Sequence, residues 1–198
     1  RDRSVSRGLG DVYKRQGSVA FDWVGTYLET RFTGGKLSVK ISETGTSYYN
    51  VFVDGKLHKV VKVCGTDTLI HLVSGIDKRI HSLKIQKRSE GEFGKTTVHQ
   101  FVLSGSGRLA EELAVRTRHI EFIGNSLTCG YGTDGKHRDE PFLVETENCN
   151  LTFASMVARY YDADYTLIAH SGRGAARNYG DSVRVSKVTM KDRMLNTF

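Results

Sequence analysis

The sequence has few cysteines and no long apolar run. Its three cysteines, Cys64, Cys129 and Cys149, are odd in number and include no CxxC pair, which argues against a disulfide framework and a structural zinc site. No apolar stretch approaches the roughly 18 residues of a membrane-spanning helix. With 38% hydrophobic and 26% charged residues in 198, the chain has the composition of a soluble globular protein of one or two domains.

The net charge of +7 is concentrated at the amino terminus. Residues 1–16 contain five basic and two acidic side chains, so only a small excess remains for the rest. This charge distribution argues against nucleic-acid binding. Residues 1–16 also lack an apolar signal-peptide core and any strand or helix periodicity, which predicts a non-native or disordered leader.

Residues 17–115 have the period-2 pattern of many half-buried strands. In KLSVKIS, for example, Leu37, Val39 and Ile41 alternate with polar residues. Gly34-Gly35 predicts a hairpin of residues 26–32 with 36–42, and Asp54-Gly55 predicts a hairpin of 48–53 with 56–63. Eight such strands predict two packed sheets, an all-β jelly-roll sandwich.

Residues 116–198 alternate strand and helix. HIEFIG (119–124) and YTLIA (165–169) are apolar strands. Residues 150–161 have a helical stripe of large apolar side chains, namely Phe153, Met156, Val157 and Tyr160. A β–α–β order implies parallel strands that end at one sheet edge, so the segments after Gly124 and His170 are expected to lie side by side.

Those two segments contain a serine and a glycine turn. Ser126 follows the first strand directly, and Ser171-Gly172-Arg173-Gly174 follows the second. A serine Oγ above a sheet edge, opposite an unhindered backbone N–H, supplies two parts of an acyl-transfer site. From spacing alone, an exposed turn serine without catalytic function is an equal alternative.

The segment IEFIGNSLTCGYG resembles the first signature block of SGNH (GDSL-type) hydrolases, and more closely carbohydrate esterase family 2, the acetylxylan and sugar 6-O-deacetylases. The resemblance continues through ETEN (145–148) and DADYTLIAHSGRGAARNYGD (162–181). It extends back through VGTYLETRFTG and YYNVFVDGK, which are similar to that family's amino-terminal jelly roll. It implies a β-sandwich followed by an incomplete α/β, flavodoxin-like three-layer domain.

The resemblance assigns roles by position. Ser126 matches the nucleophile, and its own N–H and that of Gly172 match oxyanion-hole donors, with Gly174 as the rival glycine. Arg173, Gly174 and Asn178 are candidate substrate-binding residues, although Arg173, Asn178 and Arg177 could instead brace the loop. The implied reaction is two-step hydrolysis of O-acetyl groups on polysaccharides such as xylan or glucomannan, in the bacterial periplasm or outside the cell. It implies no metal or organic cofactor and no membrane partner.

Two departures from the family pattern stand out. Asn125 replaces the usual aspartate; it keeps a carbonyl acceptor but loses the charge that would support a protonated histidine. The sequence also stops at Phe198, before the family's Gly-x-Asn-Asp and Asp-x-x-His blocks, which supply an oxyanion donor and the general base. We therefore expect this chain to be a fragment that is nearly inactive by itself.

Other candidate residues have structural interpretations. Asp134 and His137 match Asp-x-x-His in spacing but follow Ser126 too closely, and we expect His170 to be structural and Cys129 to be a small buried residue. The remaining histidines of the sandwich are expected at the surface: His58, His71, His81 and His99. Some aromatic residues could form a sugar-stacking surface instead of the core: Trp23, Tyr27, Tyr48 and Tyr49. The alternative function is a carbohydrate-binding or structural β-sandwich with a non-catalytic α/β stub.

Overall fold

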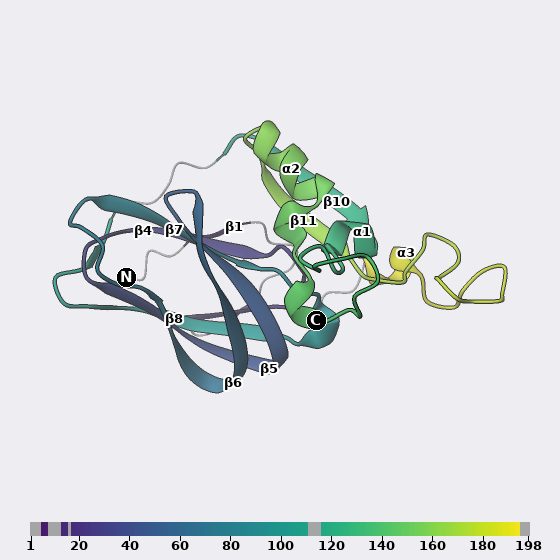
Figure 1. Ribbon diagram of the computed structural model, residues 1–198, viewed down its shortest axis with the longest axis horizontal. Coiled ribbons are helices and arrows are strands. Elements are labelled where there is room, and N and C mark those ends of the chain that lie inside the picture. Colours follow the sequence, from purple (N-terminus) through teal and green to yellow (C-terminus); the bar gives the residue numbers. More distant parts are fainter. Residues whose placement is uncertain (1–4, 8–12, 16, 111–115, 195–198) are drawn as a thin grey trace.

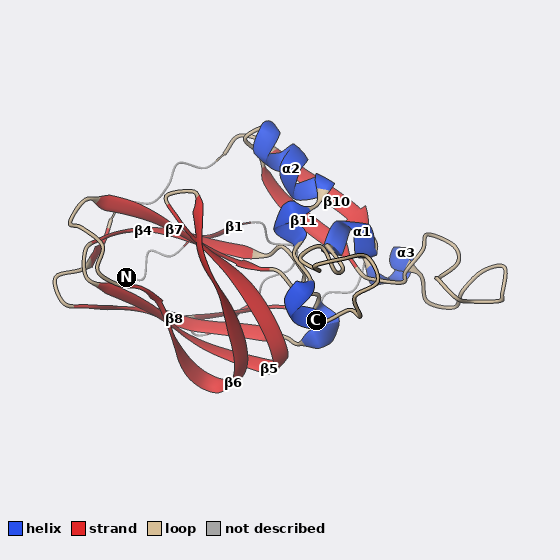
Figure 2. Cartoon of the chain, in the orientation of Figure 1, coloured by secondary structure: helices blue, strands red, loops and turns tan. Residues whose placement is uncertain are grey.

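The computed structural model describes residues 5–7, 13–15, 17–110 and 116–194. In them, nine strands form one sheet that curls around its own core, and a smaller unit of two strands and short helices lies at one end (Figures 1 and 2). The large sheet consists of β1 (Val5–Arg7), β2 (Tyr13–Arg15), β3 (Ser18–Phe21), β4 (Tyr27–Thr33), β5 (Lys36–Val53), β6 (Lys56–Val73), β7 (Ile80–Lys87), β8 (Thr96–Ser104) and β9 (Arg108–Leu109). The smaller unit contains β10 (His119–Gly124), α1 (Ser126–Cys129), α2 (Phe153–Tyr160), β11 (Asp164–Ala169) and α3 (Met190–Arg193). Three single 3-10 turns complete the list: η1 (Gly91–Phe93), η2 (Val144–Thr146) and η3 (Cys149–Leu151).

The long strand β5 joins the two layers of the curled sheet. Its first part pairs with β8 and its last part with β7, while β6 follows the opposite edge. Register shifts between Ile41 and Thr46 interrupt the ladder with β6. Here Gly45 faces the carbonyl oxygen of Phe93 so closely that a Cβ would overlap it. The prediction of two separate sheets is therefore wrong, because β5 and β6 run continuously through segments that were expected to be separate strands.

One of the two predicted hairpins forms. The Asp54-Gly55 turn pairs Val53 with Lys56 and starts the β5–β6 ladder, as expected. The Gly34-Gly35 hairpin is wrong: β4 pairs with β7, β1 and β9. The Gly34 N–H is bonded to the carbonyl oxygen of Asp77, and β5 takes β8 as its neighbour beyond the turn. A glycine pair thus permits a tight turn without selecting the strand that pairs.

Part of the expected leader is strand. β1 pairs with β4, and β2 pairs with β3, both antiparallel. The expectation of no strand structure is therefore wrong for these six residues, and the other residues of 1–16 lie outside the described part of the chain. The domain boundary at residue 16 stays a prediction.

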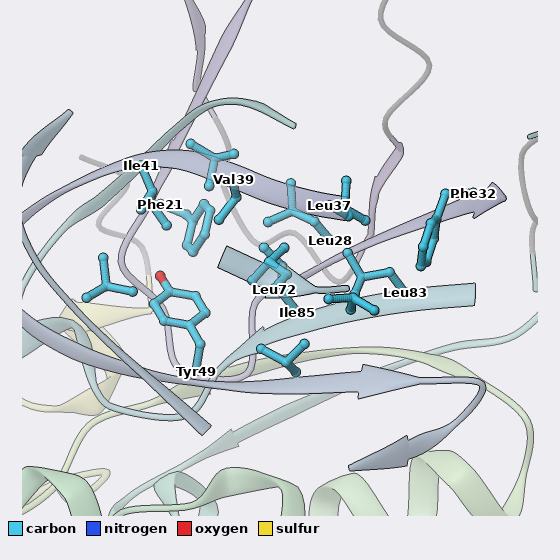
Figure 3. Packing of buried hydrophobic residues seen from close by; sticks show 14 residues of the cluster. Phe21, Leu28, Phe32, Leu37, Val39, Ile41, Tyr49, Leu72, Leu83 and Ile85 are labelled. Atoms are coloured by element: carbon cyan, nitrogen blue, oxygen red, sulfur yellow. The ribbon is translucent and has the colours of Figure 1, made fainter. Parts of the chain in front are cut away.

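The main core lies inside the curl of the sheet, where alternate side chains of facing strands meet (Figure 3). Phe21, Ile41 and Tyr49 are each at most 1% exposed. The predicted burial of Leu37, Val39 and Ile41 is confirmed, but Ser38 between them is buried as well, so the alternation is incomplete. Burial of such side chains contributes about 1.5–3 kcal/mol each relative to exposure, so this cluster is the main source of stability.

The smaller unit is a parallel strand pair with α2 in the crossover. β10 and β11 pair from His119 with Asp164 to Gly124 with Ala169. α2 buries its small side chains, Ala154, Ser155 and Ala158. The apolar stripe of Phe153, Met156, Val157 and Tyr160 exists, but it does not face this core: Tyr160 is 83% exposed. None of the helices in the described residues is long and apolar enough to cross a membrane.

His81 is not the surface residue that the sequence predicts. Its side chain is buried between two carboxylates, with Nδ1 2.7 Å from Asp54 Oδ2 and Nε2 2.9 Å from Asp77 Oδ1. The hydrogen bond to Asp54 is the largest cause that raises the pKa of His81, and it lowers the pKa of Asp54 in turn. A protonated imidazole donating from both nitrogens therefore links the 54–55 turn to the 77–80 turn.

We expect His81→Leu to lower the free energy of unfolding by about 1–2 kcal/mol, because two hydrogen bonds from a charged donor to exposed aspartates are lost. The histidine's contribution is lost as pH rises above about 6.5, and that of the aspartates as pH falls below about 4. Urea unfolding should therefore show the largest difference in stability between the wild type and His81→Leu at pH values between about 4 and about 6.5. His58→Leu, on exposed β6, is the control; an equal effect of both variants would contradict the assignment.

Candidate functional site

The predicted convergence of two loops is confirmed. β10 and β11 are parallel and in register to their ends, and His170 N donates to Gly124 O at 3.3 Å. Ser126 and Gly172, which follow these ends, line one cleft of about 830 Å³. The serine and the glycine turn therefore open into a shared space.

Ser126 is held by the turn that begins α1. Asn125 is the N-cap, and its Oδ1 accepts a hydrogen bond from Leu127 N at 3.1 Å. The Asn125 carbonyl oxygen accepts from Thr128 N and Cys129 N. The expectation that asparagine keeps the acceptor role in this loop is thus confirmed. In the described part of the chain, the Ser126 N–H has no assigned acceptor.

The two candidate glycines differ in their N–H groups. Gly172 has φ +74°, and its N–H has no assigned acceptor among the residues that the structure describes. Gly174 N instead donates to Asn178 Oδ1 at 3.2 Å. A Cβ on Gly174 would overlap Arg177 O, so close backbone packing explains the second glycine. The geometry favours Gly172 over Gly174 as an oxyanion donor.

The candidate substrate-binding residues fall into two groups. Arg173, Gly174 and Arg177 line the cleft. Asn178 braces the loop, because its Nδ2 donates to Val188 O at 2.9 Å while its Oδ1 accepts from Gly174. Arg173 also donates to Val188 O, at 3.1 Å. Asn178 therefore acts on the cleft through Gly174 rather than from its wall.

Sequence reasoning missed the wall that the large sheet contributes. Glu90, Glu92 and Phe93, at and before η1, line the cleft with Ser126. Phe142 stacks on Tyr131 with ring centroids 3.7 Å apart, and its ring centroid lies 5.8 Å from that of Phe93. These contacts join segments far apart in sequence, so only the fold reveals them. Phe93, Phe142 and Tyr131 give the cleft an aromatic side.

Neither candidate histidine of this region is placed as a base for Ser126. Nδ1 of His170 is 2.9 Å from the carbonyl oxygen of Ser171, and its Nε2 lies 3.8 Å from Glu92 Oε2. His137 is exposed and does not line the cleft. Asp134 forms an ion pair with Arg88 and accepts from Asn148 Nδ2. Asp134 therefore has structural partners, and the interpretation of Asp134 and His137 as non-catalytic stays a prediction.

Cys129 and two of the four aromatic candidates are core residues. Cys129 is fully buried, and burial raises the pKa of its thiol well above the usual range, which disfavours a reactive thiolate. Tyr27 and Tyr49 are buried, while Trp23 and Tyr48 are half-buried. Tyr27 and Tyr49 are therefore not available for sugar stacking, while Trp23 and Tyr48 keep part of their surface exposed.

In the part of the chain that the structure describes, two groups of side chains could offer metal-ligand atoms within 4.8 Å of one another: Glu90, Glu92 and His170; and Glu90, Cys129 and Glu147. Carboxylate and imidazole ligands of the first group suit zinc or a similar cation. However, two of these ligand atoms already bond the backbone of Ser171: Glu90 Oε2 accepts from its N–H, and His170 Nδ1 lies within hydrogen-bond distance of its carbonyl oxygen. The first group therefore holds the loop that begins at Ser171.

A serine just after a parallel strand, with backbone N–H groups that lack assigned acceptors beside it in a cleft, is typical of α/β serine hydrolases. Comparison with known proteins then identifies the family. The model described as "Carbohydrate esterase 2 N-terminal" matches residues 11–112. The chain belongs to carbohydrate esterase family 2.

Curated and solved relatives agree with this placement. Cellulase/esterase CelE of Acetivibrio thermocellus is 35% identical over 158 residues, covering 80% of this chain and 19% of CelE. An acetylxylan esterase / glucomannan deacetylase of Cellvibrio japonicus is 31% identical, covering 82% of this chain and 44% of that protein. A family two carbohydrate esterase from Clostridium thermocellum, solved with cellohexaose, superposes with a TM-score of 0.85 at 32% identity, covering 91% of this chain and 55% of that one. The chain spans less than half the length of these curated relatives.

We expect Asn125→Ala to lower the free energy of unfolding of the smaller unit by about 0.5–2 kcal/mol, because α1 loses its N-cap acceptor. Asn125→Asp is the matched variant and should cost little, since a carboxylate accepts from Leu127 N equally well. Thermal unfolding of both variants measures the difference. Equal destabilisation by alanine and aspartate would show that the cap does not hold this turn.

Proposed function

We propose that this chain carries the nucleophile and two oxyanion donors of a serine esterase that removes O-acetyl groups from polysaccharides. The supporting observation is the single cleft that Ser126 shares with Gly172. Both residues have backbone N–H groups without assigned acceptors in the described ranges, as an oxyanion hole requires. Membership of carbohydrate esterase family 2 supports the same reaction.

In the proposed reaction, Ser126 Oγ attacks the acetyl carbonyl carbon while a general base takes its proton. The N–H groups of Ser126 and Gly172 donate to the resulting oxyanion. The ester bond to the sugar then breaks, and the sugar oxygen takes the proton back. Water attacks the acetyl-serine in the same way, releasing acetate and restoring the hydroxyl.

We propose that the base comes from the part of the family's catalytic domain that this chain does not span. His170 is bound to its own loop, and His137 lies outside the cleft wall. The β10–α2–β11 unit would then be the first part of a three-layer α/β domain of SGNH type, with residues 116–198 forming its start after the all-β domain of residues 17–115. The bulky stripe on α2 is the face that further elements of such a domain would cover.

A glycan substrate fits the cleft. Phe93, Phe142 and Tyr131 present aromatic surface beside Ser126, and aromatic rings suit the apolar faces of sugars. The relatives are named acetylxylan esterase / glucomannan deacetylase and cellulase/esterase, so acetylated xylan or glucomannan is the proposed class. Such polymers imply an extracellular or periplasmic enzyme.

Glycan binding without hydrolysis is the second candidate function. The same aromatic wall supports it, and a solved relative carries cellohexaose. In that case the cleft, rather than the outer face of the sheet, would hold the glycan. Retention on insoluble xylan or glucomannan by a chain without esterase activity would favour binding.

Hydrolysis of p-nitrophenyl acetate tests the esterase proposal directly. The chain extended with its downstream coding sequence should hydrolyse this substrate. In that protein, Ser126→Ala should reduce kcat by at least about 10³-fold because the nucleophile is lost. The 198-residue chain alone should be nearly inactive. Equal rates for the extended protein and its Ser126→Ala variant would refute the proposal.

A further inference from the structure

Two buried glutamates from distant parts of the chain meet beneath the cleft. Glu90 follows β7 and is 2% exposed, and Glu147 precedes η3 and is fully buried. Glu90 N donates to Glu147 Oε2 at 2.8 Å. Carboxylate oxygens of both residues and Cys129 Sγ lie within 4.8 Å of one another. Neither glutamate has a role in the reaction described above.

The pair needs a proton. Within the described residues, Oε1 of Glu90 and Oε1 of Glu147 are both buried without a hydrogen-bond partner. If both carboxylates were ionised, both atoms would lack a hydrogen-bond donor, and two like charges would lie close together away from solvent. One proton shared between the two groups removes the repulsion and supplies the missing hydrogen bond. Burial, followed by the negative charge of Glu90, raises the pKa of Glu147 well above its usual range.

Among the residues that the structure describes, no lysine or arginine forms an ion pair with either carboxylate. On the sheet side, Lys87 Nζ binds Gly94 O at 2.9 Å and lies 3.6 Å from Glu43 Oε2, and Arg88 Nε donates to the backbone oxygen of Glu147. His170 Nδ1 is 3.8 Å from Glu90 Oε2 but bonds Ser171 O. Cys129 and Cys149 also face the pair, and both thiols are buried with raised pKa values. Glu90 further lines a second pocket together with Asp22, Glu92, Arg173 and Arg193. In the described residues, neither arginine forms an ion pair with Glu90 or Glu147, and Arg173 donates to Val188 O instead.

The pair is connected to the candidate oxyanion loop by one short bond. Ser171 N donates to Glu90 Oε2 at 2.6 Å, and Ser171 immediately precedes Gly172. A hydrogen bond to an ionised acceptor is about twice as strong as a neutral one. Other bonds of this loop join it to the segment that follows, such as Tyr179 N to Gly172 O at 2.8 Å and Met190 N to Gly174 O at 2.9 Å. Glu90 thus ties the start of the loop to the large sheet.

We infer that Glu90 and Glu147 form a proton-sharing carboxyl pair that positions the Ser171–Gly174 loop, with Glu90 as the positioning residue for the Gly172 N–H. The inference deepens the proposed function, since it concerns how that donor is held. Loss of the shared proton at alkaline pH places two charges beneath the loop and loosens it. The segment after β7 of the large sheet therefore positions a candidate oxyanion donor of the cleft.

Amide hydrogen exchange of Ser171 in the isotope-labelled chain, followed by NMR between about pH 6 and about pH 10, tests this inference. After correction for the intrinsic pH dependence of exchange, wild-type protection should fall at alkaline pH. Glu147→Gln keeps a neutral donor to Glu90, so it should retain protection and abolish the alkaline loss. Glu90→Gln offers Ser171 N only a neutral acceptor. The Ser171 amide of this variant should therefore exchange about five- to tenfold faster than that of the wild type near neutral pH.

Glu121→Gln, on the exposed face of β10, is the matched control and should change neither protection nor its pH dependence. Both test substitutions keep side-chain size, and the amide spectrum reports whether each variant is folded. An alkaline loss that persists in Glu147→Gln, or unchanged protection in Glu90→Gln, would overturn the inference. Ser126→Ala should leave the exchange data unchanged, so failure of the esterase proposal would not be mistaken for failure of this one.

Discussion

The geometry of the cleft depends on the buried guanidinium of Arg88. Its Nε donates to Glu147 O at 2.6 Å, Nη1 to Asn50 Oδ1 at 3.2 Å and Nη2 to Glu145 O at 3.0 Å, and it forms an ion pair with Asp134. One side chain thus joins the large sheet, the 145–148 turn and the loop after α1. Removing the partner of a buried charge typically costs about 3–5 kcal/mol, so these segments are held in one arrangement.

Other polar contacts cross the same interface. Tyr27 OH donates to Asp164 Oδ1 at 2.8 Å, and Asn50 Nδ2 donates to Asn148 Oδ1 at 3.0 Å. Gln86 also bonds the hydroxyl of Tyr165. Hydrogen bonds fix the relative orientation of the two units more tightly than apolar contacts do. This fixed orientation explains why Glu90 and Phe93 line the same cleft as Ser126. The large sheet is therefore part of the cleft, not a separate attachment to it.

Sequence patterns predict the local features of this fold well. Alternation at Leu37, Val39 and Ile41 indicates the buried face of β5, and β–α–β order places the ends of β10 and β11 together. Strand pairing is less predictable, because Gly34-Gly35 allows a turn whichever strand follows as neighbour. Helical periodicity likewise finds the stripe on α2 but not the face that packs, since Ala154 and Ala158 allow the closer approach.

The cleft was only half predictable for a similar reason. Ser126 and Gly172 follow strand ends, where motif and topology point to them. Glu90 touches Ser171 across 81 residues, and no local pattern encodes such a contact. The histidine at 81 shows the same limit, because its partners Asp54 and Asp77 come from two different turns.

The central claim is that Ser126 and Gly172 act on the same acyl group. A crystal structure of the extended protein after reaction with an organophosphonate tests it most directly, since the adduct imitates the tetrahedral intermediate. The account predicts phosphorus bonded to Ser126 Oγ and its oxygen within about 3 Å of the N atoms of Ser126 and Gly172. An unmodified Ser126, or an adduct whose oxygen points away from Gly172, would contradict it.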